Sequence, residues 1–251
     1  MFDQLVEDVF AALWALDPVA AVYLGKHEYD GNVPDWSPGT VAAHLADLDR
    51  LSGELLALDG LHEDQDIDRE LLISEIDKTR FVWMVLRSAE RNPMDWVYLL
   101  DPDLYMKRKF APEVERAAIV VRLLDSTDAV LDLARDRLDP VLARTIVEWG
   151  ITAARGLGEM IAAEVPVAFE SLESTDEGGA LLAASRSAAA SLEAFADWLE
   201  TERLPQADNG FAIGGESMEE LLRVSEMIEM SLGEMLAMAE ADLAANLAAF
   251  V

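Results

Sequence analysis

Apolar residues recur three or four positions apart through most of the chain, and this spacing constrains the fold more than any other feature. Residues 2–16 carry an apolar set that falls on one face of a helix: Leu5, Val6, Val9, Phe10, Leu13 and Trp14. No stretch alternates apolar and polar residues over the length of a strand. Further helices are predicted for residues 18–24, 38–60, 66–86, 112–138, 139–165, 180–203, 216–227 and 231–250. The sequence therefore predicts an all-α chain, an irregular multi-helix assembly of roughly 8–11 helices.

Several of these helices begin at recognisable capping residues. Asp17-Pro18 pairs an N-cap residue with a proline suited to the first helical position. Asp139-Pro140 repeats this pattern, so we expect a helix to start there. Ser231 and Glu234 form a capping-box pattern at the start of the last helix. Loops are expected at residues 25–37, 92–102, 175–179 and 204–215.

The chain is predicted to form a single all-helical domain over residues 1–251. It has the length to bury a sizeable core, and its composition is rich in Ala and Leu and poor in β-branched residues. The segment around residues 92–111 is the one candidate point of subdivision. No fixed period of about 20–50 residues is present, which argues against a repeat solenoid.

The formal net charge of −30, from 49 acidic and 19 basic residues, limits the partners of the protein. Such a surface repels phosphate backbones and anionic lipid headgroups, so neither nucleic acid nor a membrane is an expected partner. No apolar run approaches the ~18–20 residues that span a bilayer, and the first ten residues are acidic where a secretory signal is basic. These features predict a cytoplasmic protein. The acidity is interpreted either as an ordinary hydrated surface or as adaptation to high salt.

The sequence lacks a complete set of catalytic or metal-binding residues. It has no cysteine and three histidines, His27, His44 and His62. A helical zinc site needs a second histidine four residues after the first, but the fourth positions after His27 and His62 hold Gly31 and Asp66. Carboxylate pairs are too frequent in so acidic a chain for any one pair to be informative. No catalytic, cofactor-binding or metal-ligating residue is therefore predicted.

Two local features depart from the general composition. Lys107, Arg108 and Lys109 form a basic cluster, interpreted either as ion pairing with acidic helices or as an anchor for a ligand carboxylate or phosphate. The other feature is a methionine-rich stripe, which fills a helical core or offers an adaptable surface to a partner. Its members are Met218, Met227, Met230, Met235 and Met238.

Three stretches of the sequence are similar to a known bacterial family. They are "DPVAAVYLGKHEYDGNVPDWSP", "DIDRELLISEID" and "FAIGGESMEELLRVSEMIEMSLGEMLAMAEADL". Together they resemble the N-terminal half of the family known as domain of unknown function eight-eight-five. Tyr29, Asp30 and Trp36 belong to the loop signature of this resemblance, and Met218 stands where an aromatic residue is common in the family.

The resemblance implies a fold and a chemistry that extend beyond this chain. Family members are roughly double its length and look like clam-shaped helical zinc peptidases, with a His-Glu-x-x-Pro-Gly-His motif in the C-terminal half. Nothing in this sequence matches that motif, so no catalytic residue carries over, and zinc is implied only for the absent half. The apolar, uncapped end "ADLAANLAAFV" adds to the expectation of a truncated chain.

The leading hypothesis is a non-catalytic N-terminal helical portion of a peptidase-like hydrolase, which forms one wall of a substrate cleft and is inactive alone. The alternative is a stand-alone helical module for protein binding or dimerisation. In both, the Met-rich C-terminal helices are the expected docking surface, whether for the missing half, for another protein or for a second copy of the chain. A third interpretation is an enzyme with an unrecognised carboxylate site.

Overall fold

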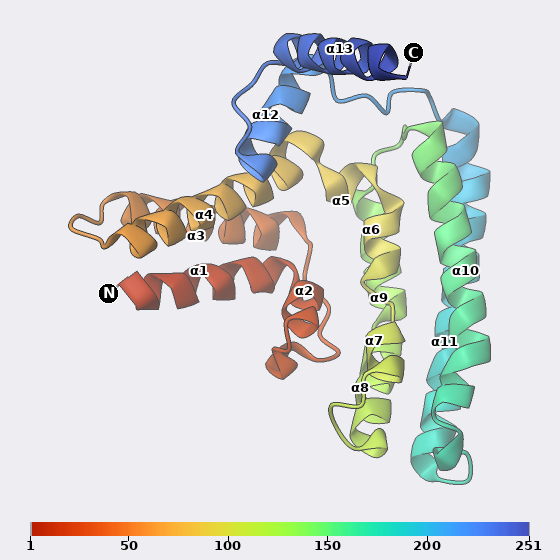
Figure 1. The fold of residues 1–251 in the computed structure, drawn as a ribbon. Helices are drawn as coiled ribbons and strands as arrows, with labels where there is room; N and C mark the ends of the chain where they lie inside the picture. Colours follow the sequence, from red (N-terminus) through yellow and green to blue (C-terminus); the bar gives the residue numbers. More distant parts are fainter. Residues whose placement is uncertain (1, 251) are drawn as a thin grey trace.

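The computed structural model describes residues 2–250, so the first and last residues of the predicted 1–251 domain lie outside it. These residues form thirteen α-helices and no strand, with one isolated bridge between Ala143 and Asp208. Nine helices have at least 11 residues, within the predicted range, and four are shorter. The predicted all-α class is therefore confirmed. In chain order (Figure 1) the helices are α1 Phe2–Leu16, α2 Pro18–Tyr23, α3 Pro38–Leu56, α4 Glu63–Phe81, α5 Ser88–Arg91, α6 Pro93–Tyr98, α7 Asp103–Lys107, α8 Glu113–Asp125, α9 Thr127–Arg137, α10 Arg144–Ala168, α11 Asp176–Trp198, α12 Gly215–Glu226 and α13 Leu232–Ala249.

The helices form two parts that meet near α5 (Figure 1). The first part, here called the limb, consists of helices α1–α4, and the second, here called the stack, consists of helices α6–α11. In the limb, helices α1, α3 and α4 pack against one another. In the stack, the long helices α10 and α11 lie side by side. The helices of the limb run across the direction of the stack. Buried residues from both parts belong to one continuous hydrophobic core, so the limb and the stack are held together by apolar packing.

Small residues bring α10 and α11 close together. At Gly158 an added Cβ would lie 3.3 Å from the carbonyl oxygen of Ala189 on α11. This close approach agrees with the small side chains that the sequence places in residues 180–203. The core residues that this packing buries almost completely are Val147, Ala154, Ile161, Ala188 and Leu192.

Arg116 on α8 is a buried charged residue, which the sequence did not predict. Its guanidinium donates hydrogen bonds to the carbonyl oxygens of Tyr105, at 2.6 Å, and Ala111, at 3.2 Å. It also lies 5.3 Å from the centre of the Phe169 ring. Because these contacts replace water around the charge, they offset the cost of burying it and fix the turn between α7 and α8.

The predicted helix start at Asp139-Pro140 is wrong, because α10 begins at Arg144. The backbone N–H of Asp139 donates to the carbonyl of Glu90 at 2.8 Å, and that of Arg144 donates to the carbonyl of Asp208 at 2.7 Å. These long-range hydrogen bonds tie residues 139–144 to other parts of the chain. Tertiary contacts therefore override the local Asp-Pro signal.

Two predicted loops are partly helical. Thr175 is the N-cap of α11, since its hydroxyl accepts a hydrogen bond from the N–H of Gly178 at 3.1 Å, so the next residues form the first helical turn despite two glycines. In the segment 92–102, Asn92 is the N-cap of α6 and Pro93 is its first residue. A side-chain oxygen of Asn92 accepts from the N–H of Met94 at 3.2 Å. Local capping therefore builds helices where composition indicated loops.

Helix α4 differs from its predicted boundaries at both ends. It starts at Glu63 rather than Asp66, and the side chain of Gln65 accepts a hydrogen bond from the N–H of His62 at 3.2 Å. It ends at Phe81, where the chain continues as one π-helical turn, Val82–Leu86. The predicted helix of residues 66–86 is therefore an α-helix followed by a wider turn that leads to α5.

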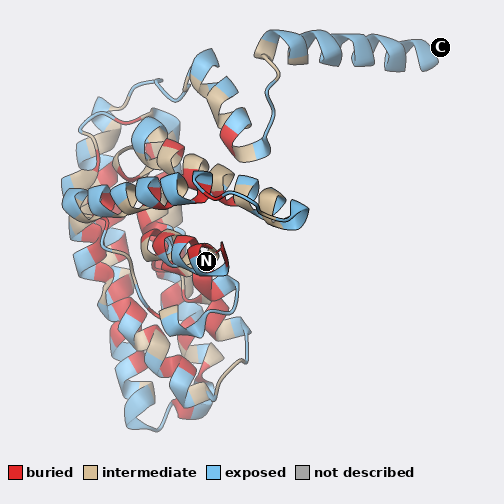
Figure 2. Cartoon of the chain, turned by 90° about the vertical axis from the view of Figure 1, so that its left-hand side faces the viewer, coloured by how far each residue is buried: buried red, intermediate tan, exposed pale blue. Residues whose placement is uncertain are grey.

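The C-terminal helices α12 and α13 are attached to the limb very differently. Helix α12 packs on α4, where the hydroxyl of Ser74 donates to the carbonyl of Val224 at 2.7 Å and the Val224 side chain is buried. Ser231 and Glu234 form the predicted capping box of α13. Helix α13 itself contains no buried residue and projects away from the rest of the molecule (Figure 2). Within residues 2–250, no helix is both long enough and apolar enough to cross a bilayer.

Candidate functional site

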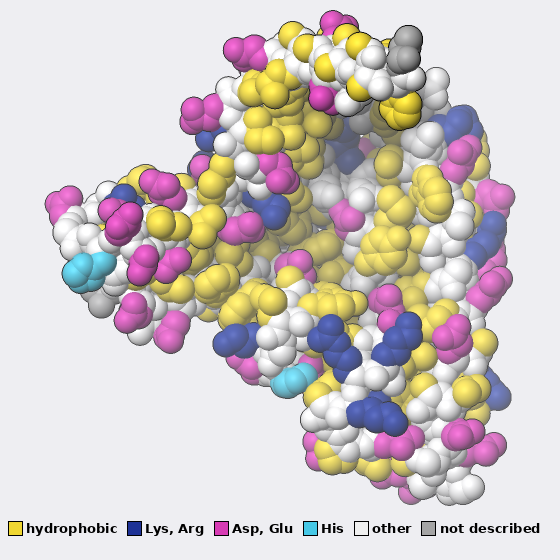
Figure 3. Space-filling model, viewed as in Figure 1, with side chains coloured by type: hydrophobic (Ala, Val, Ile, Leu, Met, Phe, Trp, Pro, Cys, Tyr) yellow, Lys and Arg dark blue, Asp and Glu magenta, His cyan; other side chains and the backbone are white. Residues whose placement is uncertain are grey.

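An open groove of about 600 Å³, here called the interlimb groove, lies between the limb and the start of the stack. Its lining comes from α1, α2, the C-terminal part of α4, the π-helical turn, α5 and α6. Apolar side chains gather where the limb meets the stack (Figure 3). A concave, mainly apolar surface with a few polar groups is the general form of a ligand site. The interlimb groove is therefore the candidate site.

Aromatic rings form much of the wall of the groove: Phe10, Trp14, Trp36, Trp83 and Tyr98. The ring of Trp36 contacts those of Trp83 and Trp96 edge-on, at centroid distances of 5.1 and 5.0 Å. Its indole N–H donates to the carbonyl of Leu16 at 2.9 Å. These contacts fix the Trp36 and Trp83 part of the wall, because neighbouring rings and the hydrogen bond to Leu16 hold the two indoles in place.

A serine and a carboxylate provide the main polar group at the α5–α6 end of the groove. The hydroxyl of Ser88 donates a hydrogen bond to Oδ2 of Asp95, and the side-chain amide of Asn92 donates to Oδ1 at 2.7 Å. Burial raises the pKa of the Asp95 carboxyl above its usual value, although the bond from Ser88 opposes this shift. Among residues 2–250, Asp95 forms no ion pair.

An unusual backbone segment places Ser88 at the groove. The π-helical turn Val82–Leu86 carries Trp83 into the wall, and Arg87 follows in the left-handed region with φ of +52°. A non-glycine residue in this region costs on the order of 1 kcal/mol or more. An ion pair between Arg87 and Asp139, at 2.9 Å, helps to hold this conformation. Single π-helical turns are frequently found at functional sites.

The groove has few titratable side chains in its lining. Its titratable lining residues are Asp17, Glu75, Lys78, Asp95 and Tyr98, and no histidine lines it. The side chains of Lys78 and Glu75 pair with each other at 3.3 Å. In residues 2–250, no three His, Cys, Asp or Glu side chains are placed so that together they could hold a metal ion, so this part of the chain does not fit the zinc site that the resemblance implies for its relatives.

A family model described as "Bacterial protein of unknown function (DUF885)" matches residues 18–250. The chain belongs to the DUF885 family. This confirms the family resemblance seen in the sequence. No curated protein matches the chain.

One solved structure shows the DUF885 fold in a longer protein. It is named a "putative lipoprotein of unknown function" from Shewanella oneidensis, and it matches this chain with a TM-score of 0.83 at 18% identity. The match covers 96% of this chain and 45% of that one, so the chain spans less than half the length of that protein. At this identity the likeness concerns the fold alone.

The loop signature of the DUF885 chain has one member in the groove. Trp36 lines the wall, whereas Asp30 is buried beside His27, with 3.1 Å between Nδ1 of the histidine and Oδ2 of the carboxyl. The His27 ring stacks on Phe110 at 4.1 Å between centroids. The ring of Tyr29 meets that of Trp14 edge-on at 6.0 Å. In residues 27–30, the signature therefore makes packing contacts that hold the loop against the stack and the limb.

The predicted basic cluster is split between separate contacts outside the groove. Lys107 forms an ion pair with Asp103 at 2.6 Å, within its own helix α7 rather than with another helix. The guanidinium of Arg108 lies 5.6 Å from the centre of the Tyr23 ring and donates to the Tyr23 carbonyl at 3.3 Å. Lys109 is exposed. None of the three lines the interlimb groove, and their role as a ligand anchor stays a prediction.

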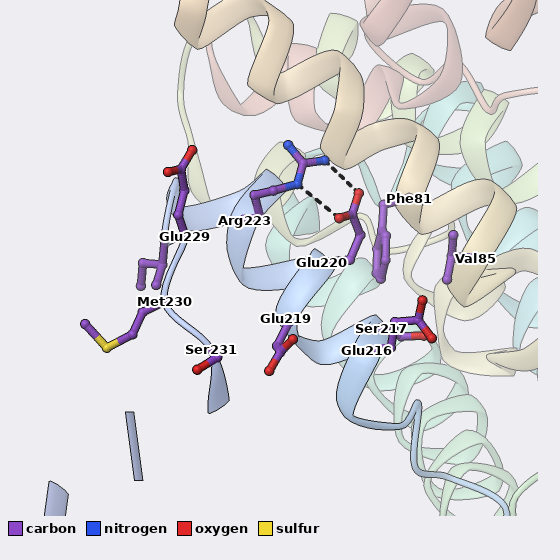
Figure 4. A pocket seen from close by; sticks show the side chains of 11 residues that line it. Phe81, Val85, Glu216, Ser217, Glu219, Glu220, Arg223, Glu229, Met230 and Ser231 are labelled. Carbon is purple, nitrogen blue, oxygen red and sulfur yellow. Dashed lines mark hydrogen bonds and ion pairs between the residues drawn. The ribbon is translucent and has the colours of Figure 1, made fainter. Parts of the chain in front are cut away.

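A second open pocket of about 600 Å³, here called the α12 pocket, lies between α12 and the end of α4 (Figure 4). Phe81 and Val85 form its apolar side. On α12, Glu220 and Arg223 pair through two hydrogen bonds of 2.7 and 3.0 Å, so the basic group of this pocket is already bound. Of the methionine stripe, Met230 lines this pocket, and Met218, Met227 and Met238 are exposed. The stripe therefore lies largely on the surface.

Proposed function

We propose that this DUF885 chain is a non-catalytic helical wall of the substrate cleft of a peptidase-like hydrolase, inactive alone and completed by another polypeptide segment. The observation that carries the proposal is the interlimb groove, which is open, aromatic and free of histidine among its lining residues. Its volume of about 600 Å³ lies within the range of small-molecule and peptide side-chain sites. The catalytic zinc of such a hydrolase would belong to the other segment.

The length of the structural relative and the state of α13 are consistent with this proposal. The relative is more than twice as long as this chain and shares its fold over the matched part. On helix α13, the side chains of Leu236, Leu243 and Leu247 are exposed, and the helix contains no buried residue. Apolar side chains in such number are stabilised when a further surface covers them.

Peptide binding and metal content test this proposal together. The purified chain is incubated with a defined mixture of peptides, and bound and cleaved species are identified by mass spectrometry. We expect peptides with apolar side chains to be retained and none to be cleaved. Stoichiometric zinc with sustained cleavage would overturn the non-catalytic role, and the absence of any retained peptide would overturn the cleft-wall role.

A stand-alone module for protein binding or dimerisation is the second candidate, because α13 contains no buried residue. In this case the exposed face of α13 pairs with a second copy or with another protein. Light scattering over a dilution series distinguishes the candidates. A concentration-dependent dimer that is lost when Leu236, Leu243 and Leu247 are all changed to Gln supports the module. A monomer at every concentration that binds no hydrophobic dye counts against a docking role for α13.

A further inference from the structure

The interlimb groove contains a carboxylate without a cationic partner. Asp95 accepts hydrogen bonds from Ser88 and Asn92, which are both neutral. The nearby cations are engaged elsewhere, since Lys78 pairs with Glu75 and Arg87 pairs with Asp139. A partly buried carboxylate is stabilised most by a positive charge, and within residues 2–250 the structure supplies none to Asp95.

The walls around this carboxylate suit the body of an organic cation. Tyr98 follows Asp95 by three residues on α6, so the two side chains share one face of that helix. Trp83 and Trp36 complete the same lining and contact each other edge-on. Aromatic faces attract ammonium groups and also bury apolar carbon, so they favour a ligand that has both.

We propose that the interlimb groove binds an ammonium group attached to an apolar body, with the ammonium at Asp95 and the apolar body against Trp83 and Tyr98. The free amino terminus of a peptide that begins with an apolar residue has this chemistry, as does a simple arylalkylamine. The inference rests on the proposed function in one respect, since it takes the groove to be the surface that meets the substrate.

The positions of Ser88 and Asn92 strengthen this assignment. Each gives its hydrogen bond to a different oxygen of Asp95, so the carboxylate is held in one orientation before a ligand arrives. A preoriented acceptor loses less entropy on binding than a mobile one. Ser88 follows directly on the π-helical turn and the left-handed Arg87. This strained backbone segment therefore sets the position from which Ser88 reaches Asp95.

Calorimetric titration of the full chain with two matched ligands tests the inference. Phenethylamine carries the cation, and N-acetylphenethylamine has the same aromatic body without it. We expect phenethylamine to bind at least about tenfold more tightly, the difference that one charge-assisted hydrogen bond supplies. Asp95→Asn is expected to remove this preference and to leave the weak binding of the acetylated ligand unchanged.

Asp101→Asn is the matched control, because Asp101 is also a partly buried carboxyl with a raised pKa. Asp101 lines an adjoining cavity of about 190 Å³, which shares Tyr98 with the interlimb groove but does not include Asp95. The control variant is expected to leave both affinities unchanged. Equal binding of the two ligands to the unaltered chain would overturn the ammonium assignment and leave the cleft-wall role intact. Failure of both ligands to bind would overturn the ammonium assignment, and the peptide-retention experiment decides the cleft-wall role separately. The comparison of ligands on the unaltered chain does not depend on the folding of any variant.

Discussion

The ring of Trp36 meets the ring of Trp83 edge-on with 5.1 Å between their centroids, and this contact joins the loop before α3 to the π-helical turn after α4. Trp36 is also buried and donates its indole N–H to Leu16. We expect Trp36→Ala to lower the free energy of unfolding by about 3–5 kcal/mol, the usual cost of removing a buried large aromatic residue. Urea denaturation measures this loss. Trp149→Ala is the control, because Trp149 is 63% exposed, and a similar loss there would refute the special role of Trp36.

Two glycines of α10 are expected to respond oppositely to the same substitution. At Gly150 an added Cβ would lie 2.6 Å from Cγ of Pro93, so Gly150→Ala forces α10 away from α6 and lowers the free energy of unfolding by about 1–3 kcal/mol. At Gly156 nothing lies within 4 Å, so Gly156→Ala raises it by about 0.5–1 kcal/mol through helix propensity. Thermal and urea unfolding of both variants check this. Effects of equal sign would contradict the packing of α10 on α6.

The raised pKa of Asp101 makes stability depend on pH. Burial raises the pKa of this carboxyl above its usual value of 3.8, so just above that pH the folded state binds more protons than the unfolded state. The free energy of unfolding contributed by Asp101 therefore falls as the pH rises from 3.8 through the folded-state pKa, and then stays constant. Asp101→Asn removes this dependence. Urea unfolding between about pH 4 and pH 7 is expected to show a flatter profile for the variant, and parallel profiles would count against the shift.

The large excess of negative charge makes stability depend on salt. Arg155 already binds Glu193, Asp197 and Glu200 at 2.7–3.1 Å, so one cation is shared by three carboxylates. With 49 acidic and 19 basic residues, most carboxylates repel others, and salt at about 0.1 M screens such repulsion beyond roughly 10 Å. We expect the melting temperature to rise as KCl is added. A steep rise that continues to molar KCl supports the high-salt interpretation, and a flat response contradicts it.

The exposed face of α13 is expected to contribute little to the stability of the isolated chain. Changing Leu236, Leu243 and Leu247 together to Gln should alter the free energy of unfolding by less than about 0.5 kcal/mol per site, because none of them is buried. Leu192→Ala on α11 is the control and should cost about 2–5 kcal/mol. The triple variant should also reduce the fluorescence of a bound hydrophobic dye. A large loss of stability would show that α13 packs on the chain.

Local signals in the sequence were sufficient for most helices but not for those set by distant contacts. The Asp17-Pro18 start and the Ser231–Glu234 capping box depend on neighbours within a few residues, and both are present in the structure. The start of α10 depends on hydrogen bonds to Glu90 and Asp208, which lie 49 and 64 residues away from their partners Asp139 and Arg144. No window of local sequence contains that information.

The residues that line the interlimb groove were even harder to predict from the sequence. Asp95 is one of 49 acidic residues, and what distinguishes it is burial in a groove lined by rings from α1, the π-helical turn and α6. Trp36 could be singled out because the family resemblance marked its loop. Lys107, Arg108 and Lys109 stood out by composition, yet they lie outside the groove. Scarcity of a residue type was therefore a poor guide to its position relative to the candidate site.

The π-helical turn Val82–Leu86 also sets the rotational phase of everything that follows α4. Each residue of an α-helix turns the chain by about 100°, and a π-helical turn accommodates one residue more than an α-helical turn. Deleting a single residue in this turn would let α4 run on in regular α-helical phase. The direction in which α5 and α6 leave the limb would then rotate by roughly a quarter of a circle or more, and Ser88 and Asp95 would no longer face the aromatic wall. The length of this turn, together with Trp83, therefore fixes where the polar and the aromatic sides of the groove meet.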